Sequence, residues 1–136
     1  NVTDTLAPAA QEKGLALTAD IAVDRLPADP KLLQRVIMNL VSNAIKFTDK
    51  GFVRVRAWQD EKGYYLSVAD SGVGISEHDL KGLFQKYHQV HTDRQGYGLG
   101  LFISRQIMQA HGGTLDVTSK PGEGSVFTLS IPKEQK

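Results

Sequence analysis

Apolar residues recur three and four positions apart in three segments of the chain, which is the spacing of amphipathic helices. The predicted helices cover residues 2–13, 30–47 and about 99–110. The second has the clearest start, because Asp29 can cap the free N–H groups and Pro30 suits the first helical position. A short fourth helix is predicted to begin at Ser76.

Alternation of apolar and polar residues, together with glycine-bearing turns, marks strands with one buried face. It predicts strands at 15–21, 52–58, 64–69, 114–118 and 125–131. Polar, glycine-bearing turns join the second strand to the third and the fourth to the fifth. Hairpins with helices between them predict an α+β fold, a two-layer sandwich with about three helices on one face of a mostly antiparallel, mixed sheet.

Length and composition are those of one ordinary globular domain, which we expect to span 1–136. The formal net charge of +1 gives no electrostatic footprint for nucleic acid, so no nucleic-acid partner is expected. The absence of cysteine excludes disulfides, thiolate zinc sites and cysteine nucleophiles from these residues. Because the first residue is Asn1, we expect the chain to be a piece of a longer protein.

Three polar side chains project from one face of the second predicted helix. Asn39, Asn43 and Lys46 are spaced by four and three residues, beside the apolar stripe. An amide oxygen suits Mg²⁺, and an ammonium can neutralise phosphate oxygens. The alternative is an ordinary solvated helix face.

A carboxylate followed by glycines ends the third strand, in residues 70–74. Ionised Asp70 only accepts hydrogen bonds, so it would favour a ligand edge that donates, such as the adenine amino group. Gly72 and Gly74 would permit close approach to the ligand. The alternative is a tight turn in which Asp70 bonds its own backbone.

Three glycines precede the last helix, in the segment 96–100. Their exposed N–H groups and the helix N-terminus would suit phosphate, although a flexible hinge explains them equally well. None of the four histidines has metal-ligand spacing with a carboxylate, so a histidine metal site is not expected.

Taken together, these segments resemble the catalytic ATP-binding domain of sensor histidine kinases, within the wider group that includes DNA gyrase and MutL. Residues 33–48 are similar to the N box, 70–75 to the G1 box, 83–87 to the F box and 96–101 to the G2 box. The four motifs stand in the family's order over about 29–132. The resemblance implies the Bergerat fold, with ATP and Mg²⁺ as cofactors.

The resemblance gives each candidate residue a role. Asp70 would bind the adenine amino group, Asn43 would ligate Mg²⁺, and Asn39 would support the phosphates or the metal's water shell. Lys46 would contact the phosphate chain, and Asn39 and Lys46 are therefore the catalytic candidates. The complete set of implied nucleotide contacts is Asn39, Asn43, Lys46, Phe47, Asp70, Gly72, Gly74, Ile75, Tyr87, Arg94, Gly96, Gly98, Leu99, Gly100 and Leu101.

The lid differs from the family pattern. Tyr97 stands where the family usually has Thr or Ser, and the segment 91–95 is short, with Arg94 its only basic residue for the γ-phosphate. Hydrolytic relatives carry a glutamate at the position of Asn39 as the general base. An amide cannot take that proton, so phosphoryl transfer is favoured over ATP hydrolysis.

The implied activity is that of a protein-histidine kinase catalytic domain in a two-component system. The implied partners are the protein's own dimerisation domain, which carries the phospho-accepting histidine, and a downstream response regulator. A cytoplasmic location, in a free or membrane-bound sensor, is expected, with a dimeric full-length protein and a monomeric isolated domain. Two alternatives remain: a module that senses ATP without phosphotransfer, and an interaction domain that retains only the fold.

Overall fold

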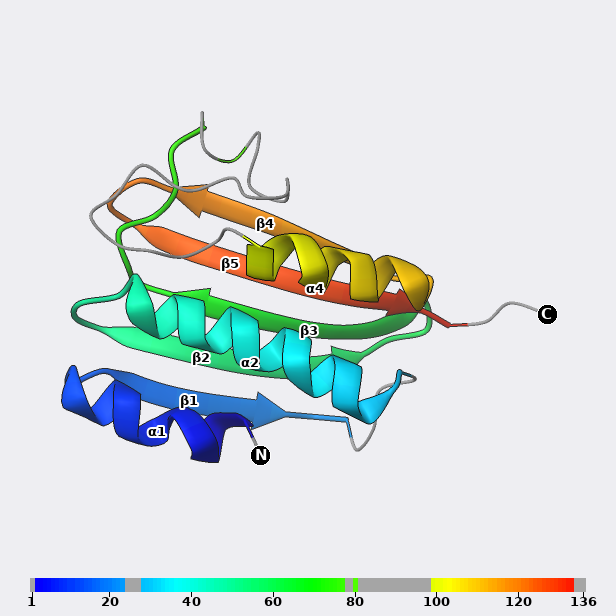
Figure 1. Ribbon diagram of the computed structural model, residues 1–136, viewed down its shortest axis with the longest axis horizontal. Coiled ribbons are helices and arrows are strands. Elements are labelled where there is room, and N and C mark those ends of the chain that lie inside the picture. The colour runs from blue at the N-terminus through cyan, green and yellow to red at the C-terminus, as the bar shows by residue number, and fades with distance from the viewer. Residues whose placement is uncertain (1, 24–27, 78–79, 81–98, 134–136) are drawn as a thin grey trace.

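The computed structural model describes residues 2–23, 28–77, 80 and 99–133. In these ranges three helices lie over a sheet of five strands (Figure 1). The helices are α1 (Val2–Glu12), α2 (Pro30–Lys46) and α4 (Leu99–Ala110). The strands are β1 (Ala16–Ile21), β2 (Phe52–Gln59), β3 (Gly63–Asp70), β4 (Thr114–Lys120) and β5 (Gly124–Pro132).

The sheet has the strand order β1-β2-β3-β5-β4. β1 pairs with β2 in parallel, whereas the other three neighbouring pairs are antiparallel. The three helices cover one face of the sheet, with α1 over β1, α2 over the centre and α4 over β4 and β5 (Figure 1). The predicted α+β sandwich with a mixed, mostly antiparallel sheet is confirmed.

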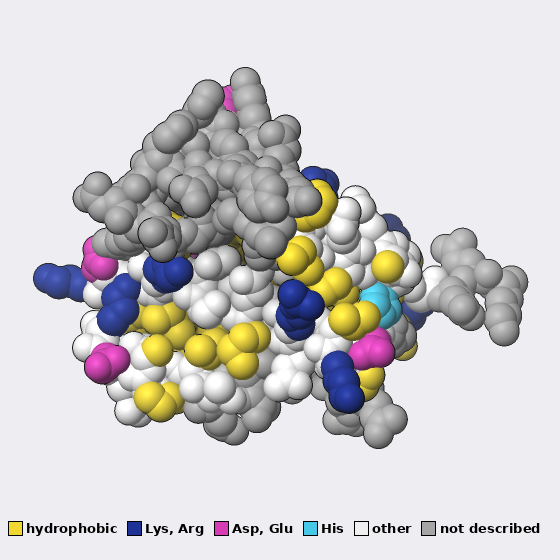
Figure 2. Space-filling view, in the orientation of Figure 1, with side chains coloured by type: hydrophobic (Ala, Val, Ile, Leu, Met, Phe, Trp, Pro, Cys, Tyr) yellow, Lys and Arg dark blue, Asp and Glu magenta, His cyan; other side chains and the backbone are white. Residues whose placement is uncertain are grey.

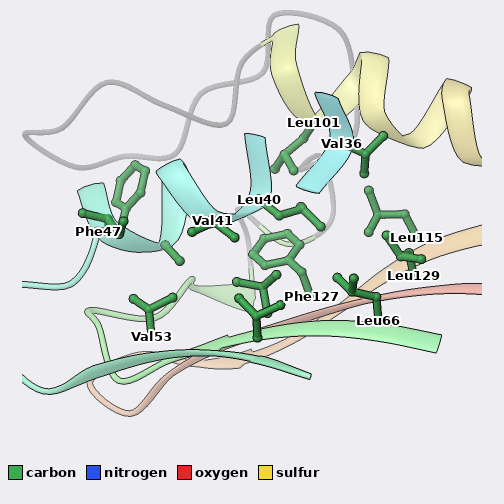
Figure 3. Close-up of a cluster of buried hydrophobic side chains, with 14 of the residues drawn as sticks. Val36, Leu40, Val41, Phe47, Val53, Leu66, Leu101, Leu115, Phe127 and Leu129 are labelled. Carbon is green, nitrogen blue, oxygen red and sulfur yellow. The ribbon is translucent and has the colours of Figure 1, made fainter. Parts of the chain in front are cut away.

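The core lies between the helical layer and the sheet. Along β2, Val53 and Val55 are buried and Arg54 and Arg56 are exposed, as the alternation predicted. Apolar side chains from α2 and α4 meet those of β3, β4 and β5 in this layer (Figure 3). Helical and strand periodicities are therefore satisfied by the same buried layer, while the charged helical surface shows only scattered apolar patches (Figure 2).

The element boundaries follow local chemistry closely. The Asp29 carboxylate accepts hydrogen bonds from the N–H groups of Lys31 and Leu32, at 2.9 and 3.1 Å, so the predicted N-cap of α2 is confirmed. The last hairpin is longer than predicted, because its ladder continues to the pair Lys120–Gly124. Gly124 has φ +115°, a conformation that side chains rarely adopt, and this lets the strand begin directly at the turn.

Several predicted features fall wholly or mostly outside the described ranges. They are the short helix beginning at Ser76, the F-box segment 83–87 and the lid segment 91–95. Among the residues that are described, no helix has the length and apolar character needed to span a bilayer.

Candidate functional site

The loop that follows β3 is attached to the C-terminal end of α2. The N–H of Val73 donates to the carbonyl of Phe47, the residue that caps α2, at 3.2 Å. One turn earlier in the same helix lies Asn43. The acid at the end of β3 and the amide-bearing helix, which are separate in the sequence, therefore meet at one place.

Gly72 makes this close approach of loop and helix sterically feasible. A Cβ atom on Gly72 would lie 2.3 Å from the Phe47 carbonyl oxygen, 2.7 Å from Thr48 Oγ1 and 3.0 Å from Asp70 Oδ1. These three oxygens therefore converge on the space that a side chain would fill. Any residue larger than glycine would push the loop away from α2.

The other side of the loop packs against the β4–β5 turn. Gly74 has φ +75°, and a Cβ there would lie 2.1 Å from the carbonyl oxygen of Lys120. Hydrogen bonds run from the N–H of Gly122 to the carbonyl of Val73, at 2.8 Å, and from the N–H of Ile75 to Ser119 Oγ, at 2.8 Å. The loop is thus fixed on both sides by direct backbone contacts.

Asp70 is buried in this fixed loop, with only 6% of its surface exposed. Its Oδ1 accepts a hydrogen bond from the N–H of Gly72 at 2.9 Å, so the predicted local turn does form. Its Oδ2 is buried and has no hydrogen-bond partner among the residues that the structure describes. Burial raises the pKa of this carboxyl above its usual range, opposed in part by the N–H groups of Gly72 and Ser125. One oxygen thus shapes the loop, and the other is available to a ligand that donates a hydrogen bond.

Thr48 is a second polar group at this point that the sequence analysis did not select. It is fully buried, and within the described part of the chain its hydroxyl also lacks a hydrogen-bond partner. It lies near enough to Asp70 to favour the charged carboxylate slightly. A ligand placed beside Asp70 would therefore meet a hydroxyl that can donate or accept.

The three predicted polar residues of α2 differ in burial. Asn43 is buried, with 7% of its surface exposed, whereas Asn39 is half-buried and Lys46 is exposed. Within the described ranges no cluster of three or more metal-binding His, Asp or Glu side chains exists. A metal ion here would therefore depend on amide oxygens and on oxygens that the ligand itself brings.

Asn39 lies in a cavity between α2 and α4. The cavity measures about 280 Å³ and is lined by Arg35, Met38, Asn39, Ser42, Ile103 and Ser104. Across it, Asn39 Nδ2 donates to Ser104 Oγ at 3.0 Å. Ser104 was also not selected from the sequence. The cavity lies further toward the start of α2 than the Asp70 loop.

The C-terminal carbonyls of α2 are satisfied by a residue outside the predicted motifs. Lys13 Nζ donates to the carbonyl of Ile45 at 2.7 Å and to that of Lys46 at 3.2 Å, and it lies 3.8 Å from Asp49. Positive charge at a helix C-terminus is stabilising. Lys13 therefore helps to fix the end of the helix on which the Asp70 loop rests.

The remaining predicted contacts divide into three groups. Phe47, Ile75 and Leu101 are buried in the hydrophobic core. Leu99 and Gly100, the last two residues of the glycine-bearing segment, are also the first two residues of α4, where the pattern predicted the helix to begin. Tyr87, Arg94, Gly96 and Gly98 lie outside the described residues, so their roles stay predictions.

Comparison with known families identifies the chain. Residues 28–135 match the family described as "Histidine kinase-, DNA gyrase B-, and HSP90-like ATPase". The chain belongs to this family. The matched region includes both α2 and the Asp70 loop, so the resemblance noted from the four motifs is confirmed.

Similar members of the family are sensor histidine kinases. The chain is 42% identical over 125 residues to the circadian input-output histidine kinase CikA of Synechococcus elongatus, and 45% identical over 107 residues to the sensor protein TorS of Escherichia coli. These matches cover 88% and 79% of this chain but 17% and 12% of the relatives. The chain therefore spans less than a fifth of either protein.

Solved structures of kinases in the family share the fold. Full-length ShkA in complex with AMPPNP superposes with a TM-score of 0.84 at 31% identity, over 96% of this chain and 28% of that one. The catalytic domain of the histidine kinase ThkA gives a TM-score of 0.84 at 27% identity, over 97% and 89% of the two chains. The architecture is thus that of a histidine kinase catalytic domain.

Proposed function

We propose that this domain binds ATP with Mg²⁺ and positions the γ-phosphoryl group for transfer to a histidine on an adjacent domain. The observation that carries the proposal is the Asp70 carboxylate, which is buried with Oδ2 lacking a partner. A buried acceptor without a partner costs about 1–3 kcal/mol, and a ligand that supplies a donor relieves that cost. Such a cost is expected at a binding site.

The ligand edge that fits Asp70 is an amino group. The ionised carboxylate cannot donate, so it favours the adenine amino group and repels the carbonyl that guanine presents there. Gly72 lets the loop that follows Asp70 pack closely against the end of α2, and the Thr48 hydroxyl there offers a second polar contact. We therefore assign the adenine to this end of the site.

The phosphates are assigned to the face of α2 that leads away from Asp70. We propose that the Asn43 amide oxygen ligates Mg²⁺, that Asn39 supports the phosphates or the water shell of the metal, and that Lys46 neutralises the phosphate chain. A single amide oxygen fits Mg²⁺ because this ion usually takes most of its other ligands from phosphate and water. When bound, Mg²⁺ would neutralise negative charge on the phosphate oxygens.

The lid contacts come from the resemblance alone. Arg94 would reach the γ-phosphate, Tyr87 would line the site, and Gly96, Gly98 and Gly100 would let the lid close. Gly74 and Ile75 would complete the adenine pocket, and the resemblance also assigns nucleotide contacts to Phe47, Leu99 and Leu101.

Asn39 supports transfer over hydrolysis. An amide cannot act as the general base that activates water, whereas transfer of a phosphoryl group depends mainly on positioning and charge neutralisation. The acceptor would be a histidine of the protein's own dimerisation domain, and a response regulator would receive the phosphoryl group afterwards. We propose a cytoplasmic location and a homodimeric full-length protein, because the chain matches only a small part of multidomain sensor kinases.

Calorimetry of the 136-residue chain with ADP, GDP and Mg²⁺ tests the binding step. We expect ADP to bind and GDP not to bind, and Asp70→Asn to weaken ADP binding by about 10- to 150-fold, the ratio for a charge-assisted hydrogen bond. Asn43→Ala should remove the Mg²⁺ dependence. Equal affinity for ADP in the Asp70→Asn variant would overturn the adenine assignment.

Labelled ATP tests the transfer step. The chain is mixed with a separately prepared histidine-bearing dimerisation domain, and label on that domain is the expected result. Nucleotide binding without any transfer of label would favour the ATP-sensing alternative.

A further inference from the structure

The Asn39 amide is held by a residue on a different helix. Its Nδ2 donates to Ser104 Oγ at 3.0 Å, and Ser104 is only 2% exposed. The two residues lie 65 positions apart in the sequence. A buried hydroxyl in the packed interface between α2 and α4 is a fixed partner, because the side chain has little freedom to turn away.

This contact also determines which end of the amide faces the site. An amide has an oxygen that accepts and a nitrogen that donates, on opposite sides of the same carbon. With Nδ2 directed to Ser104, Oδ1 is the end left for a ligand in the cavity that both residues line. Asn39 therefore offers an acceptor.

We propose that Ser104 is a positioning residue that orients Asn39 so that its Oδ1 acts on the Mg²⁺ ion or its bound water, and not on a phosphate oxygen. Phosphate oxygens only accept hydrogen bonds, so they would need the Nδ2 end, which is turned toward Ser104 and has one of its two N–H groups already bonded there. This inference rests on the proposed binding of Mg²⁺ and ATP, and it decides between the two roles left open for Asn39.

A second contact between the same two helices provides a matched control. The N–H of Asp29 donates to His111 Nε2 at 3.1 Å, which joins the start of α2 to the residue following α4. This contact lies at the far end of α2 from the Asp70 loop. His111→Ala weakens the attachment of α4 to α2 and leaves the Asn39–Ser104 hydrogen bond in place. It therefore shows how weaker helix packing by itself changes the Mg²⁺ response.

The experiment measures the Mg²⁺ concentration that gives half-maximal enhancement of ADP binding to the 136-residue chain. We expect Ser104→Ala to raise it about fivefold, the ratio for one hydrogen bond of about 1 kcal/mol. ADP affinity in EDTA should be unchanged. His111→Ala should leave the Mg²⁺ response unchanged, and Ser104→Ala should have no further effect in an Asn39→Ala background.

Asn39→Asp separates the two chemical roles of the amide. A carboxylate keeps an acceptor at this position, so under the proposal the Mg²⁺-dependent enhancement is retained or strengthened. A donor role toward phosphate predicts that the enhancement and the affinity are both lost, because the carboxylate repels phosphate oxygens.

The failures can be distinguished. An unchanged Mg²⁺ response in Ser104→Ala, or equal shifts in Ser104→Ala and His111→Ala, overturns the positioning role while ADP binding by the parent chain stands. Failure of the parent chain to bind ADP overturns the proposed function itself. Melting curves of each variant confirm that the comparison is made between folded proteins.

Discussion

At its C-terminal end α2 meets the Asp70 loop through backbone atoms, whereas further up the same helix it meets α4 through a pair of polar side chains. At the first place, carbonyl and N–H groups of Phe47 and Val73 bond directly, and glycine is required at position 72 for the contact. At the second, Asn39 and Ser104 bond across a cavity of about 280 Å³.

The difference matches the chemistry assigned to the two ends. Recognition of one planar base needs an acceptor in a fixed place, and backbone packing around Asp70 provides it before any ligand arrives. Charged phosphates and a metal bring their own oxygens and water, so the second end needs amides that can be oriented within a more open space. The adenine end is therefore expected to be rigid and the phosphate end to respond to its ligands.

The largest effect on stability is expected when a methyl group is added at Gly74, where the backbone of the Asp70 loop touches the β4–β5 turn. Gly74→Ala places a Cβ against the Lys120 carbonyl in a left-handed conformation, and should lower the free energy of unfolding by about 3 kcal/mol. Gly122 has a similar φ of +80° but nothing within 4 Å, so Gly122→Ala should cost only about 1 kcal/mol. Urea denaturation of both variants measures the difference, and equal losses would argue against tight packing of the loop.

The next largest effect is expected from Asp70→Asn, which should raise the free energy of unfolding. Because the native pKa of Asp70 is raised above its ordinary value of 3.8, ionisation destabilises the ligand-free domain as the pH rises through the native pKa. Asp70→Asn should therefore stabilise the domain by about 1 kcal/mol at neutral pH. The gain should shrink as the pH falls through the native pKa and should be lost below 3.8, where Asp70 is protonated in both the native and the unfolded parent.

Chemical denaturation at several pH values measures this gain. A variant that is less stable than the parent at neutral pH would show that the charged carboxylate contributes to the fold.

A smaller loss is expected at the end of α2. Lys13→Met removes the ammonium that bonds the last carbonyls of the helix and should lower the free energy of unfolding by about 1 kcal/mol. Lys50→Met, at an exposed lysine nearby, is the control and should change it by less than about 0.5 kcal/mol. If the two variants have the same free energy of unfolding, Lys13 does not stabilise the C-terminal end of α2.

The smallest effect on stability is expected at the exposed phosphate end. Lys46→Ala should change the free energy of unfolding by less than about 0.5 kcal/mol. It should weaken ATP binding a few-fold, since an exposed ion pair contributes about 0.2–1 kcal/mol, and leave AMP binding nearly unchanged. Calorimetry with ATP and AMP measures the loss of affinity for each nucleotide. Equal losses for both would show that Lys46 does not contact the outer phosphates.

The sequence predicted most of the frame because the signals are local. Asp29 and Pro30 mark the start of α2, and the alternation along β2 separates buried Val53 from exposed Arg54. The parallel pairing of β1 with β2 is a different matter: alternation identifies a strand but carries no information about the direction of its neighbour.

The site was predicted only in part, for the same reason. Asp70 and the amides of α2 could be selected because their residue types and spacing point to a ligand. Thr48 could not, since a threonine at the end of a helix is ordinary and only the structure shows its buried hydroxyl without a partner. Ser104 and Lys13 act on residues of another element, and such contacts depend on how helices pack, which no local pattern encodes.

The pairing of β3 with β5 has a consequence for how the family can vary. The pair Asp70–Ser125 joins the two ends of a long excursion of the chain, which includes α4, β4 and the whole lid segment. Strand register is set by the ladder itself, and lengthening a surface loop adds little entropic cost. Insertions or deletions in the lid can therefore accumulate during evolution without displacing the carboxylate at the end of the central strand β3, so lid length and base recognition are free to change independently.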